Sequence, residues 1–489
     1  MNNLKISDLT EIARRAMIEN GFVIQFPPTV LQEITLLEEN QSLLFADSSA
    51  RDLRHLLWSS IDNKTSRDLD QVEYAEQLSN GDIKILIGIA DVDALAPKDS
   101  AIDKFAARNT VTVYTESEIF PMLPERLSTD LTSLREAVDR FAIIVEMTVS
   151  ENGETGESNV YRALARNYAK LSYEETGAWL DENAKPPDIF SKVEGLREQI
   201  SLQQKAAERL AEFRRQKGAL EFETIESETV TTGGEITNLK AVLPNSAQKI
   251  IENFMIAANV EMAEFLESKN ITSIRRVVKT PARWEGIRRI AASFGANLPE
   301  IPDSRALSAF LEKRKSADEV HFPDLSLSII KLLGAGEYVV QSPNEDAGGH
   351  FGLAVRDYTH STAPNRRYAD LIVQRLVKAA LGKKVAPYTA EELNAIAARC
   401  NERESAARKV ERQMRKVVAA SVMQTRVGEI FQAIVTGITP SGTFARILKP
   451  PVDGRVVRGE ENLQIGEKIN VRLIGVDVEK GFIDFALER

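Results

Sequence analysis

Residues 61–71 read IDNKTSRDLDQ, and this short polar stretch contains three aspartates, Asp62, Asp68 and Asp70. The strand-like run DIKILIGIA follows it at residues 82–90. β-Branched and apolar residues in such a run are typical of a buried strand. The acidic stretch is therefore expected to be a loop on a sheet, and it decides how the rest of the chain is interpreted.

The spacing of the aspartates favours a cation site. If Asp68 to Asp70 is extended, residues two apart point to the same side, so both carboxylates face one point. Two unit charges about 4 Å apart repel by roughly 4 kcal/mol at an effective dielectric near 20, and Asp62 adds a third. Carboxylate oxygens with water suit Mg²⁺ or Mn²⁺. The alternative is a solvated acidic turn, which is commoner for loops of this composition.

Composition indicates a soluble, multidomain protein. The 489 residues correspond to about three domains, and 43% of them are hydrophobic. No run of about 18 apolar residues and no signal-peptide core is present, so we expect a cytoplasmic protein with no membrane partner. The single cysteine and four histidines form no zinc motif. No phosphate-binding glycine loop or nucleophile elbow occurs, which excludes nucleotide-driven and serine chemistry.

Charge is unevenly distributed along the chain. The net charge of −10 argues against a uniformly basic nucleic-acid surface. Basic residues nevertheless gather near Arg366 and in residues 403–416. An acidic exterior with a basic groove for nucleic acid is therefore compatible with the sequence.

The last sixty residues differ in character from the rest. From residue 428 onward, apolar and polar residues alternate, with glycines at the turns. About five short strands are expected there, which is the content of an OB-fold barrel. Phe431 and Phe444 are candidates to meet RNA bases, and the alternative for about half of such aromatics is the barrel core.

Five motifs occur in an order that defines a family. They are IDNKTSRDLDQ (61–71), GIADV (88–92), FPMLPERLS (120–128), IENFMIAANVEMA (251–263) and HFGLAVRDYTHSTAPNRRYADL (350–371). With these motifs the chain resembles the ribonuclease II / ribonuclease R (RNB) family of 3′→5′ exoribonucleases.

The resemblance implies an α+β fold with four segments. Residues 50–385 correspond to a mixed α/β RNB catalytic domain, and the basic helical segment 386–427 completes it. Residues 428–489 correspond to an S-one-type OB-fold RNA-binding barrel of five strands. Residues 1–49 read as a small helical module, helix-turn-helix-like, where family members usually carry cold-shock domains.

The resemblance also implies roles for the acidic loop. Asp62, Asp68 and Asp70 match three of the family's four catalytic aspartates, which hold Mg²⁺, or possibly Mn²⁺, and the scissile phosphate. The fourth position is Gln71 in this sequence. Arg366 resembles the arginine that clamps the phosphate.

Three further residues match the family's RNA contacts. Tyr114 resembles the aromatic that stacks on a base near the cleavage site and sets the shortest product. Phe222 matches a second base-stacking aromatic, and Glu411 a residue that contacts the terminal nucleotide.

The expected function follows from the resemblance. It is Mg-dependent hydrolysis of single-stranded RNA from the 3′ end to nucleoside 5′-monophosphates, in RNA degradation and processing, by a monomer without an obligate protein partner. One alternative is a catalytically weak or silent RNA-binding protein of the same fold, because Gln71 replaces an acid. A weaker alternative is an endonuclease or a DNA-directed nuclease.

Overall fold

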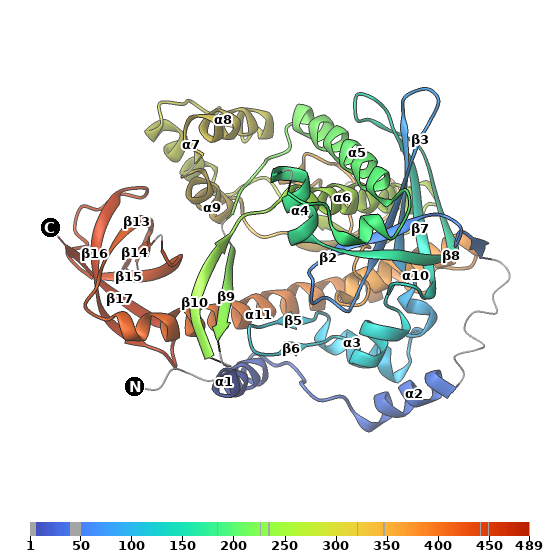
Figure 1. The fold of residues 1–489 in the computed structure, drawn as a ribbon, viewed down its shortest axis with the longest axis horizontal. Coiled ribbons are helices and arrows are strands. Elements are labelled where there is room, and N and C mark those ends of the chain that lie inside the picture. The colour runs from blue at the N-terminus through green and yellow to red at the C-terminus, as the bar shows by residue number, and fades with distance from the viewer. Residues whose placement is uncertain are drawn as a thin grey trace.

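A large α+β body, a long helix and a small barrel make up the computed structural model (Figure 1). The structure describes residues 6–39, 50–182, 184–224, 226–232, 235–319, 321–345, 348–440, 442–447 and 449–488. The long helix α11 (Ala390–Met423) runs from the barrel toward the body. The predicted α+β class is therefore confirmed.

The body is built on one mixed sheet. Its strand order is β1-β8-β2-β3-β4-β7, and β8 also pairs with β7, so the sheet closes on itself. β8 pairs parallel with β1 and β2. The pairs β2–β3, β3–β4 and β4–β7 are antiparallel. The bounds are β1 (Arg51–Asp52), β2 (Trp58–Asp62), β3 (Gln71–Gln77), β4 (Ile83–Ala90), β7 (Asp139–Val149) and β8 (Thr155–Ser172).

The predicted strand at 82–90 is β4, which is buried at every position but one because the sheet is covered. β2 ends at Asp62 and β3 begins at Gln71, so the acidic stretch is the connection between two neighbouring strands, as expected.

Helices cover this sheet. α5 packs on β3 and β4, and α6 packs on β2, β7 and β8. α6 begins with a capping box made by Asn245 and Gln248, and its apolar face is buried. The bounds are α3 (Ala101–Asn109), α4 (Tyr173–Glu182), α5 (Leu196–Lys217), α6 (Ser246–Ser268) and α10 (Tyr368–Leu381).

Smaller elements surround this body. A three-helix cluster has its own apolar core, and three two-stranded pieces flank α11 and the body. The bounds are α7 (Trp284–Ser293), α8 (Ser304–Ala317), α9 (Phe322–Leu333), β5 (Val113–Tyr114), β6 (Ile119–Phe120), β9 (Glu226–Thr232), β10 (Glu235–Val242), β11 (Ser273–Val277) and β12 (Glu337–Gln341), with short turns at η2 (Val92–Ala94), η3 (Leu127–Leu131), η4 (Asp188–Ser191), η5 (Phe351–Leu353) and η6 (Gln424–Arg426).

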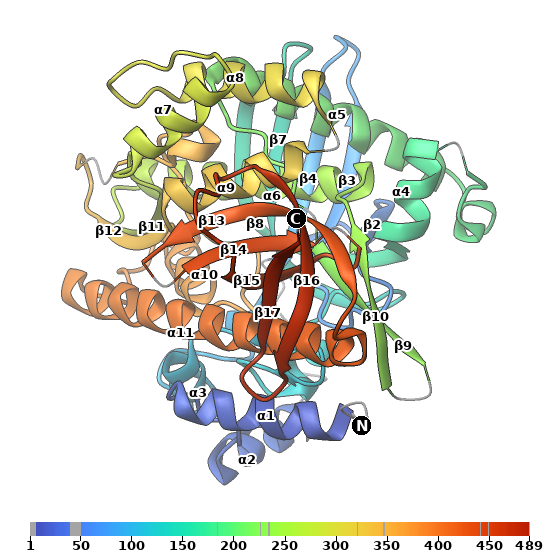
Figure 2. The same ribbon diagram turned by 90° about the vertical axis from the view of Figure 1, so that its left-hand side faces the viewer.

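Two helices form the described part of the N-terminal module, α1 (Ile6–Glu19) and α2 (Pro28–Glu39). α1 packs against α11 and lies below it in both views (Figures 1 and 2). Arg403 of α11 donates to the carbonyls of Asn20 and Gly21 at 3.0 Å each, which closes the end of α1. Residues 1–5 and 40–49 of the predicted module lie outside the described residues.

The C-terminal segment is a closed five-stranded barrel, as predicted, with order β13-β14-β15-β17-β16. Its strands are β13 (Ile430–Thr439), β14 (Gly442–Ile447), β15 (Val452–Arg458), β16 (Lys468–Asp477) and β17 (Phe482–Glu488). The barrel core continues into buried residues of α1, α11, β5, β6 and β10. The barrel is therefore packed onto the rest of the chain, as Figure 2 shows from its side.

Across the described residues, no helix combines the length and the apolar character that crossing a membrane requires.

Candidate active site

Asp62 ends β2 and begins the acidic loop. Its Oδ1 accepts the backbone N–H of Asn63 at 2.6 Å and the hydroxyl of Ser66 at 2.8 Å, so a local turn orients this carboxylate. Within the described residues its Oδ2 accepts no hydrogen bond. Burial raises the pKa of Asp62, and the charge of Asp68 raises it further.

The segment from Asp68 to Asp70 is anchored through Leu69. Leu69 is buried; its backbone N–H donates to the Ser133 hydroxyl oxygen at 3.0 Å, and its carbonyl accepts the backbone N–H of Leu134. Asp68 accepts the hydroxyl of Tyr114 on Oδ2 at 3.2 Å. The loop is thus held at Asp68 and at the following Leu69.

Asp70 is the most enclosed of the three aspartates, with 3% of its surface exposed. Its Oδ1 accepts the backbone N–H of Asn365 at 3.3 Å, and its Oδ2 accepts Nε of Arg366 at 3.2 Å. Burial is the main cause that raises the pKa of Asp70 to about 7; Arg366 opposes this shift and Asp68 adds to it.

Arg366 reaches Asp70 from the loop before α10, where the sequence predicted a phosphate-facing arginine. Its carbonyl accepts the backbone N–H of Thr112 at 2.9 Å, and the neighbouring Asn365 accepts the hydroxyl of Thr132 at 2.6 Å. The Arg366 side chain is 46% exposed. In the described part of the chain, the Arg366 side chain donates one hydrogen bond, from Nε to Asp70. The two terminal nitrogens of Arg366 therefore remain available to an anion.

The donor set fits a hard divalent cation. Asp62 and Asp68 each keep one carboxylate oxygen without a hydrogen bond among the described residues. No three His, Cys, Asp or Glu side chains of those residues converge closely enough to hold a metal ion alone. Mg²⁺ is usually bound through one or two carboxylates, with water and substrate phosphate completing its shell, so two such acids suffice.

Tyr114 lies at the end of β5, beside this site, and is 39% exposed. Glu411 of α11 lies next to Tyr114, and its carboxylate accepts a hydrogen bond from the Tyr114 backbone. That bond lowers the pKa of Glu411, but burial outweighs it and raises the pKa. The structure therefore brings together Tyr114, Glu411 and Asp68, which the sequence predicted separately.

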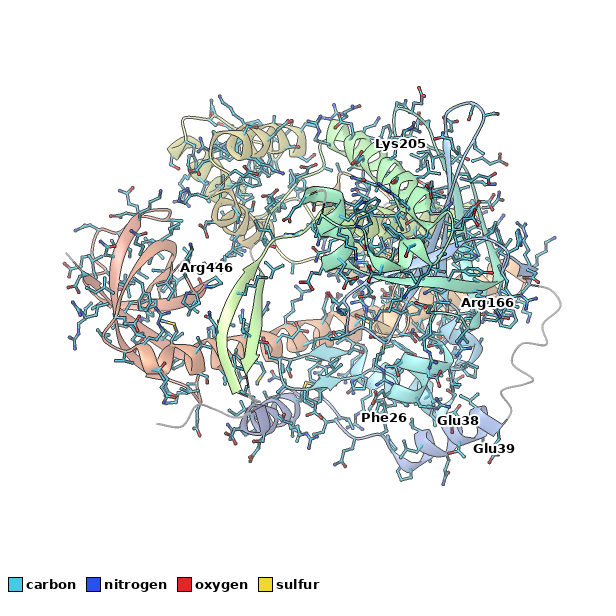
Figure 3. All side chains as sticks on the ribbon, viewed as in Figure 1. Phe26, Glu38, Glu39, Arg166, Lys205 and Arg446 are labelled. Atoms are coloured by element: carbon cyan, nitrogen blue, oxygen red, sulfur yellow. The ribbon has the colours of Figure 1, made fainter. Side chains whose placement is uncertain are left out.

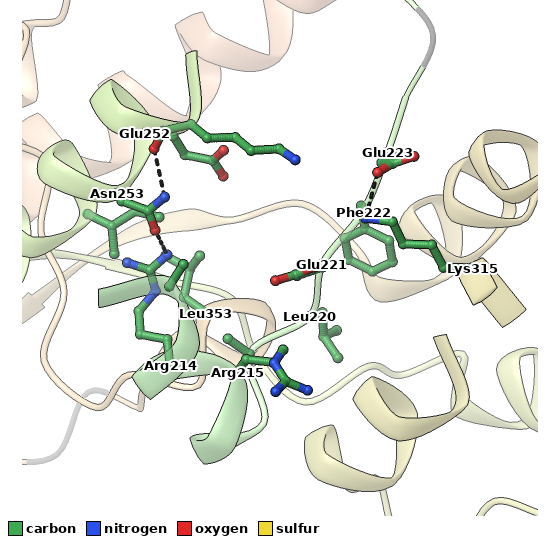
Figure 4. A pocket seen from close by; sticks show the side chains of 14 residues that line it. Arg214, Arg215, Leu220, Glu221, Phe222, Glu223, Glu252, Asn253, Lys315 and Leu353 are labelled. Atoms are coloured by element: carbon green, nitrogen blue, oxygen red, sulfur yellow. Dashed lines mark hydrogen bonds and ion pairs between the residues drawn. The ribbon is translucent and has the colours of Figure 1, made fainter. Parts of the chain in front are cut away.

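Phe222 lies elsewhere, in a pocket of about 140 Å³ between α5, α6 and the three-helix cluster (Figure 4). Arg214, Asn253 and Lys315 line it, and Arg214 donates to Asn253 at 2.5 Å. None of the three aspartates lines this pocket. The predicted stacking role of Phe222 stays a prediction.

The two barrel aromatics have different surroundings. Phe431 is 8% exposed and belongs to the core that joins the barrel to α11, so the core alternative describes it. Phe444 is half-buried and alternates with the buried Thr443 and Ala445. The nearby Arg446 lies on the side of the barrel toward α9 (Figure 3). Its positive charge there opposes the burial that raises the pKa of Asp324.

The sequence reasoning missed Glu73 and Tyr173, which lie near Asp62. Tyr173 begins α4, and its pKa is raised by burial and then by the charges of Asp62 and Glu73. Glu73 is fully buried on β3. Glu73 alternates with the apolar Val72 and Tyr74, which is the pattern of a strand with one polar face, so no signal in the sequence marked it as a buried acid.

The fold and the site define a class of protein: an α+β body with an arginine-facing acidic site, joined to an OB-type barrel. The RNB domain matches residues 50–383, and the RNase II-type exonuclease C-terminal S1 domain matches residues 429–488. The chain belongs to the RNB family, and the resemblance stated from the sequence is confirmed.

Ribonuclease R from Vibrio parahaemolyticus is 29% identical in an alignment of 477 positions that covers 89% of this chain and 56% of that protein. The chain spans less than two thirds of the length of this relative.

Two solved structures have a similar fold. Mycoplasma genitalium RNase R, in complex with ribose-methylated single-stranded RNA, matches with a TM-score of 0.86 and 22% identity over 98% of this chain and 78% of that chain. Yeast Ssd1, a pseudonuclease, matches with a TM-score of 0.71 and 17% identity over 96% of this chain and 59% of that chain.

Proposed function

We propose that this protein is a 3′→5′ exoribonuclease that hydrolyses single-stranded RNA to nucleoside 5′-monophosphates with Mg²⁺. The observation that carries the proposal is the convergence of Asp62, Asp68 and Asp70 with Arg366, which is 296 positions from Asp70 in the sequence. Membership of the RNB family and the similarity to ribonuclease R support it. Cytoplasmic location and a monomeric state remain predictions.

The roles of the residues follow from their contacts. Among the described residues, Asp62 and Asp68 each have a carboxylate oxygen without a hydrogen bond, and they would hold Mg²⁺. When bound, this ion lowers the pKa of a water and stabilises charge on the phosphate. Arg366 donates from its terminal nitrogens to a phosphate oxygen, while Asp70 fixes its orientation through Nε.

The 3′ end of the bound RNA must be held next to this site by contacts to its bases and ribose. Tyr114 exposes its ring and is fixed by its hydroxyl bond to Asp68, so it can stack on a base. Glu411 provides a carboxylate beside it for a ribose hydroxyl. Phe222 and Phe444 are further stacking candidates, and an RNase R of similar fold has been solved with single-stranded RNA.

The experiment is a time course of a 5′-labelled single-stranded RNA with Mg²⁺ or with EDTA. We expect Mg-dependent conversion to a short end product, which Asp70→Asn abolishes while RNA binding persists. Asp188→Asn is the matched control, because Asp188 is exposed and, among the described residues, forms its ion pair with the surface Lys185. Full activity of the Asp70→Asn variant contradicts the proposal.

A second candidate function is RNA binding without hydrolysis. It is favoured by Gln71, which is neutral where the family resemblance expects an acid, and by the fold similarity to the pseudonuclease Ssd1. In the same assay this function predicts RNA that stays intact with Mg²⁺ and still shifts on a native gel.

A further inference from the structure

A strongly basic surface lies on the C-terminal half of α11. Residues 405–423 of this helix contain one acid, Glu411, and five cations, in a chain whose net charge is −10. All five cations are exposed, whereas Val410 and Met414 of the same helix are buried, so the cations occupy its solvent side. We call this surface the α11 basic face, and it consists of Arg408, Lys409, Arg412, Arg415 and Lys416.

Most charges of the α11 basic face have no acidic partner. Arg408 pairs with Glu404 at 2.8 Å, and among the described residues no ion pair includes any of the other four cations. Arg412 lies four residues from both Arg408 and Lys416, and like charges at this spacing destabilise a helix. The stability of α11 therefore does not account for the cluster.

A cleft of about 380 Å³ lies against this face, between α11 and the start of β12. Three of the five cations line it, together with the acids Glu337 and Glu404. Both acids also pair with cations that do not line the cleft, Glu337 with Lys279 and Glu404 with Arg276. The cleft therefore keeps an excess of positive charge, which attracts an anion.

The α11 basic face lies between the acidic site and the barrel. Glu411 accepts a hydrogen bond from the Tyr114 backbone, and the Tyr114 hydroxyl donates to Asp68. Five residues further along α11, Cβ of Lys416 lies 2.7 Å from the position of a Cβ added to Gly481, in the turn before β17. At 1.5 Å per residue, about 8 Å of helix separates these two contacts. The shortest connection from the barrel to the acidic site therefore runs along this part of α11.

Arg415 extends the face toward the acidic site. Its positive charge opposes the burial that raises the pKa of Glu411 and of Glu116, which lies two residues after Tyr114. Among the described residues Arg415 forms no ion pair with either glutamate, so its guanidinium remains available to a phosphate oxygen on the Tyr114 side of the helix.

We propose that the α11 basic face binds phosphates of the RNA strand that enters the acidic site, upstream of the nucleotides that contact Tyr114. Arginines and lysines without partners donate charge-assisted hydrogen bonds to phosphate oxygens and release counterions from the strand. An acidic polypeptide needs the same charge, but RNA is favoured because the face adjoins Tyr114. This proposal rests on the proposed function and adds a binding surface outside the acidic site and the barrel.

The test measures binding of a labelled single-stranded RNA to the full chain by fluorescence anisotropy, in EDTA so that metal-dependent cleavage is prevented. Lys409→Gln/Arg412→Gln removes two cations that have no described ion pair. We expect about a tenfold loss of affinity near 0.1 M salt. The slope of log K against log salt concentration should become shallower by about 1.4, because each phosphate contact of a single strand contributes about 0.7.

Lys192→Gln/Lys205→Gln is the matched control, because it removes two exposed lysines outside α11. Figure 3 labels Lys205 on α5, on the far side of the body from α11. We expect wild-type affinity and slope for this control. An equal loss in both double variants means that only the overall charge matters, which overturns the proposal.

The competing explanation is a solvated charged face without a ligand. In that case Lys409→Gln/Arg412→Gln binds RNA with the affinity and slope of the wild type, which overturns the proposal. Lys409→Arg/Arg412→Lys keeps both charges and is expected to keep the wild-type slope; a loss as large as that of the glutamine variant points to a structural role and also overturns it.

Poly-L-glutamate probes the other class of partner. Binding of this polymer that the glutamine variant loses, while its RNA binding stays that of the wild type, overturns the proposal in favour of an acidic protein. We expect the opposite result, in which the variant loses RNA affinity.

RNA cleavage separates this proposal from the proposed function. Mg-dependent cleavage by the wild type, together with unchanged RNA binding by the glutamine variant, rejects only the role of the α11 basic face. RNA binding that depends on this face, without any cleavage by the wild type, rejects the exonuclease and retains the binding surface.

Discussion

At the scale of single residues, Asp70 couples stability to pH. Its pKa in the metal-free fold is about 7 because it is buried, whereas an unfolded aspartate titrates near 4. Between these values the folded state binds more protons than the unfolded state. The contribution of protonated Asp70 to the free energy of unfolding is therefore fully present below about pH 4. It decreases as the pH rises toward 7, by roughly 1.4 kcal/mol per unit of pKa shift.

Asp70→Asn removes this titration. In EDTA, we expect the free energy of unfolding of the variant, relative to the wild type, to rise from pH 4.5 to 7.5 and then level off. Urea denaturation at several pH values measures it. Asp188→Asn, at an exposed position, serves as the control with no such slope, and a constant difference between Asp70→Asn and the wild type contradicts the burial argument.

Tyr114 carries the second prediction at this scale. Tyr114→Ala removes the ring, so we expect RNA affinity to fall by about 1–3 kcal/mol and the end product to become longer. Tyr114→Phe keeps the ring and loses only the bond to Asp68, so its product length should stay that of the wild type. Gel analysis of end products measures both, with Tyr168→Ala on β8 as the control; unchanged product length in Tyr114→Ala contradicts the stacking role.

The residues of the site were predictable to different degrees. Asp62, Asp68 and Asp70 lie in one short motif, and Arg366 lies in another, so local sequence was enough to select them. That Arg366 contacts Asp70, whereas Tyr114 contacts Asp68, depends on distant segments meeting. No local pattern contains that information.

At the scale of elements, the end of α1 depends on α11. Gly21 has a φ of 77°, and a Cβ there meets Nη1 of Arg403 at 3.0 Å. Gly295, after α7, has a φ of 72° and no atom within 4 Å of such a Cβ. An alanine at either position must adopt a left-handed backbone conformation, which destabilises the fold by about 1–2 kcal/mol.

In Gly21→Ala the Arg403 guanidinium must in addition shift by a few tenths of an ångström, which weakens its bonds to two carbonyls, so we expect this variant to lose about 1 kcal/mol more than Gly295→Ala. Urea denaturation compares the two variants. Equal losses contradict a role of Arg403 in holding α1.

The elements themselves were predictable where a periodic pattern and its end signals agree. The strand-like run at residues 82–90 predicted β4, and the alternation after residue 428 predicted β13 to β17. Phe431 shows the limit of this reasoning: alternation puts it on one of two barrel faces, and only the packing of α11 makes its face part of a core.

At the scale of the whole molecule, the barrel and α11 share one core although the sequence predicts a boundary between them near residue 428. The turn before β17 approaches α11 so closely that a Cβ at Gly481 lies 2.7 Å from Cβ of Lys416 and 2.9 Å from the backbone nitrogen of Val417. A helix backbone cannot move aside, so a side chain at 481 must separate the barrel from α11.

Gly481→Ala therefore tests whether the barrel is held by this contact. We expect a loss of about 1–3 kcal/mol from overpacking and faster hydrogen exchange in both the end of α11 and the barrel. Gly466→Ala is the matched control, because Gly466 also has a positive φ, 88°, but no atom lies within 4 Å of its added Cβ. Its exchange should change only in its own loop. If both variants leave exchange in α11 unchanged, the barrel is an independent unit that the shared core does not couple to the α+β body.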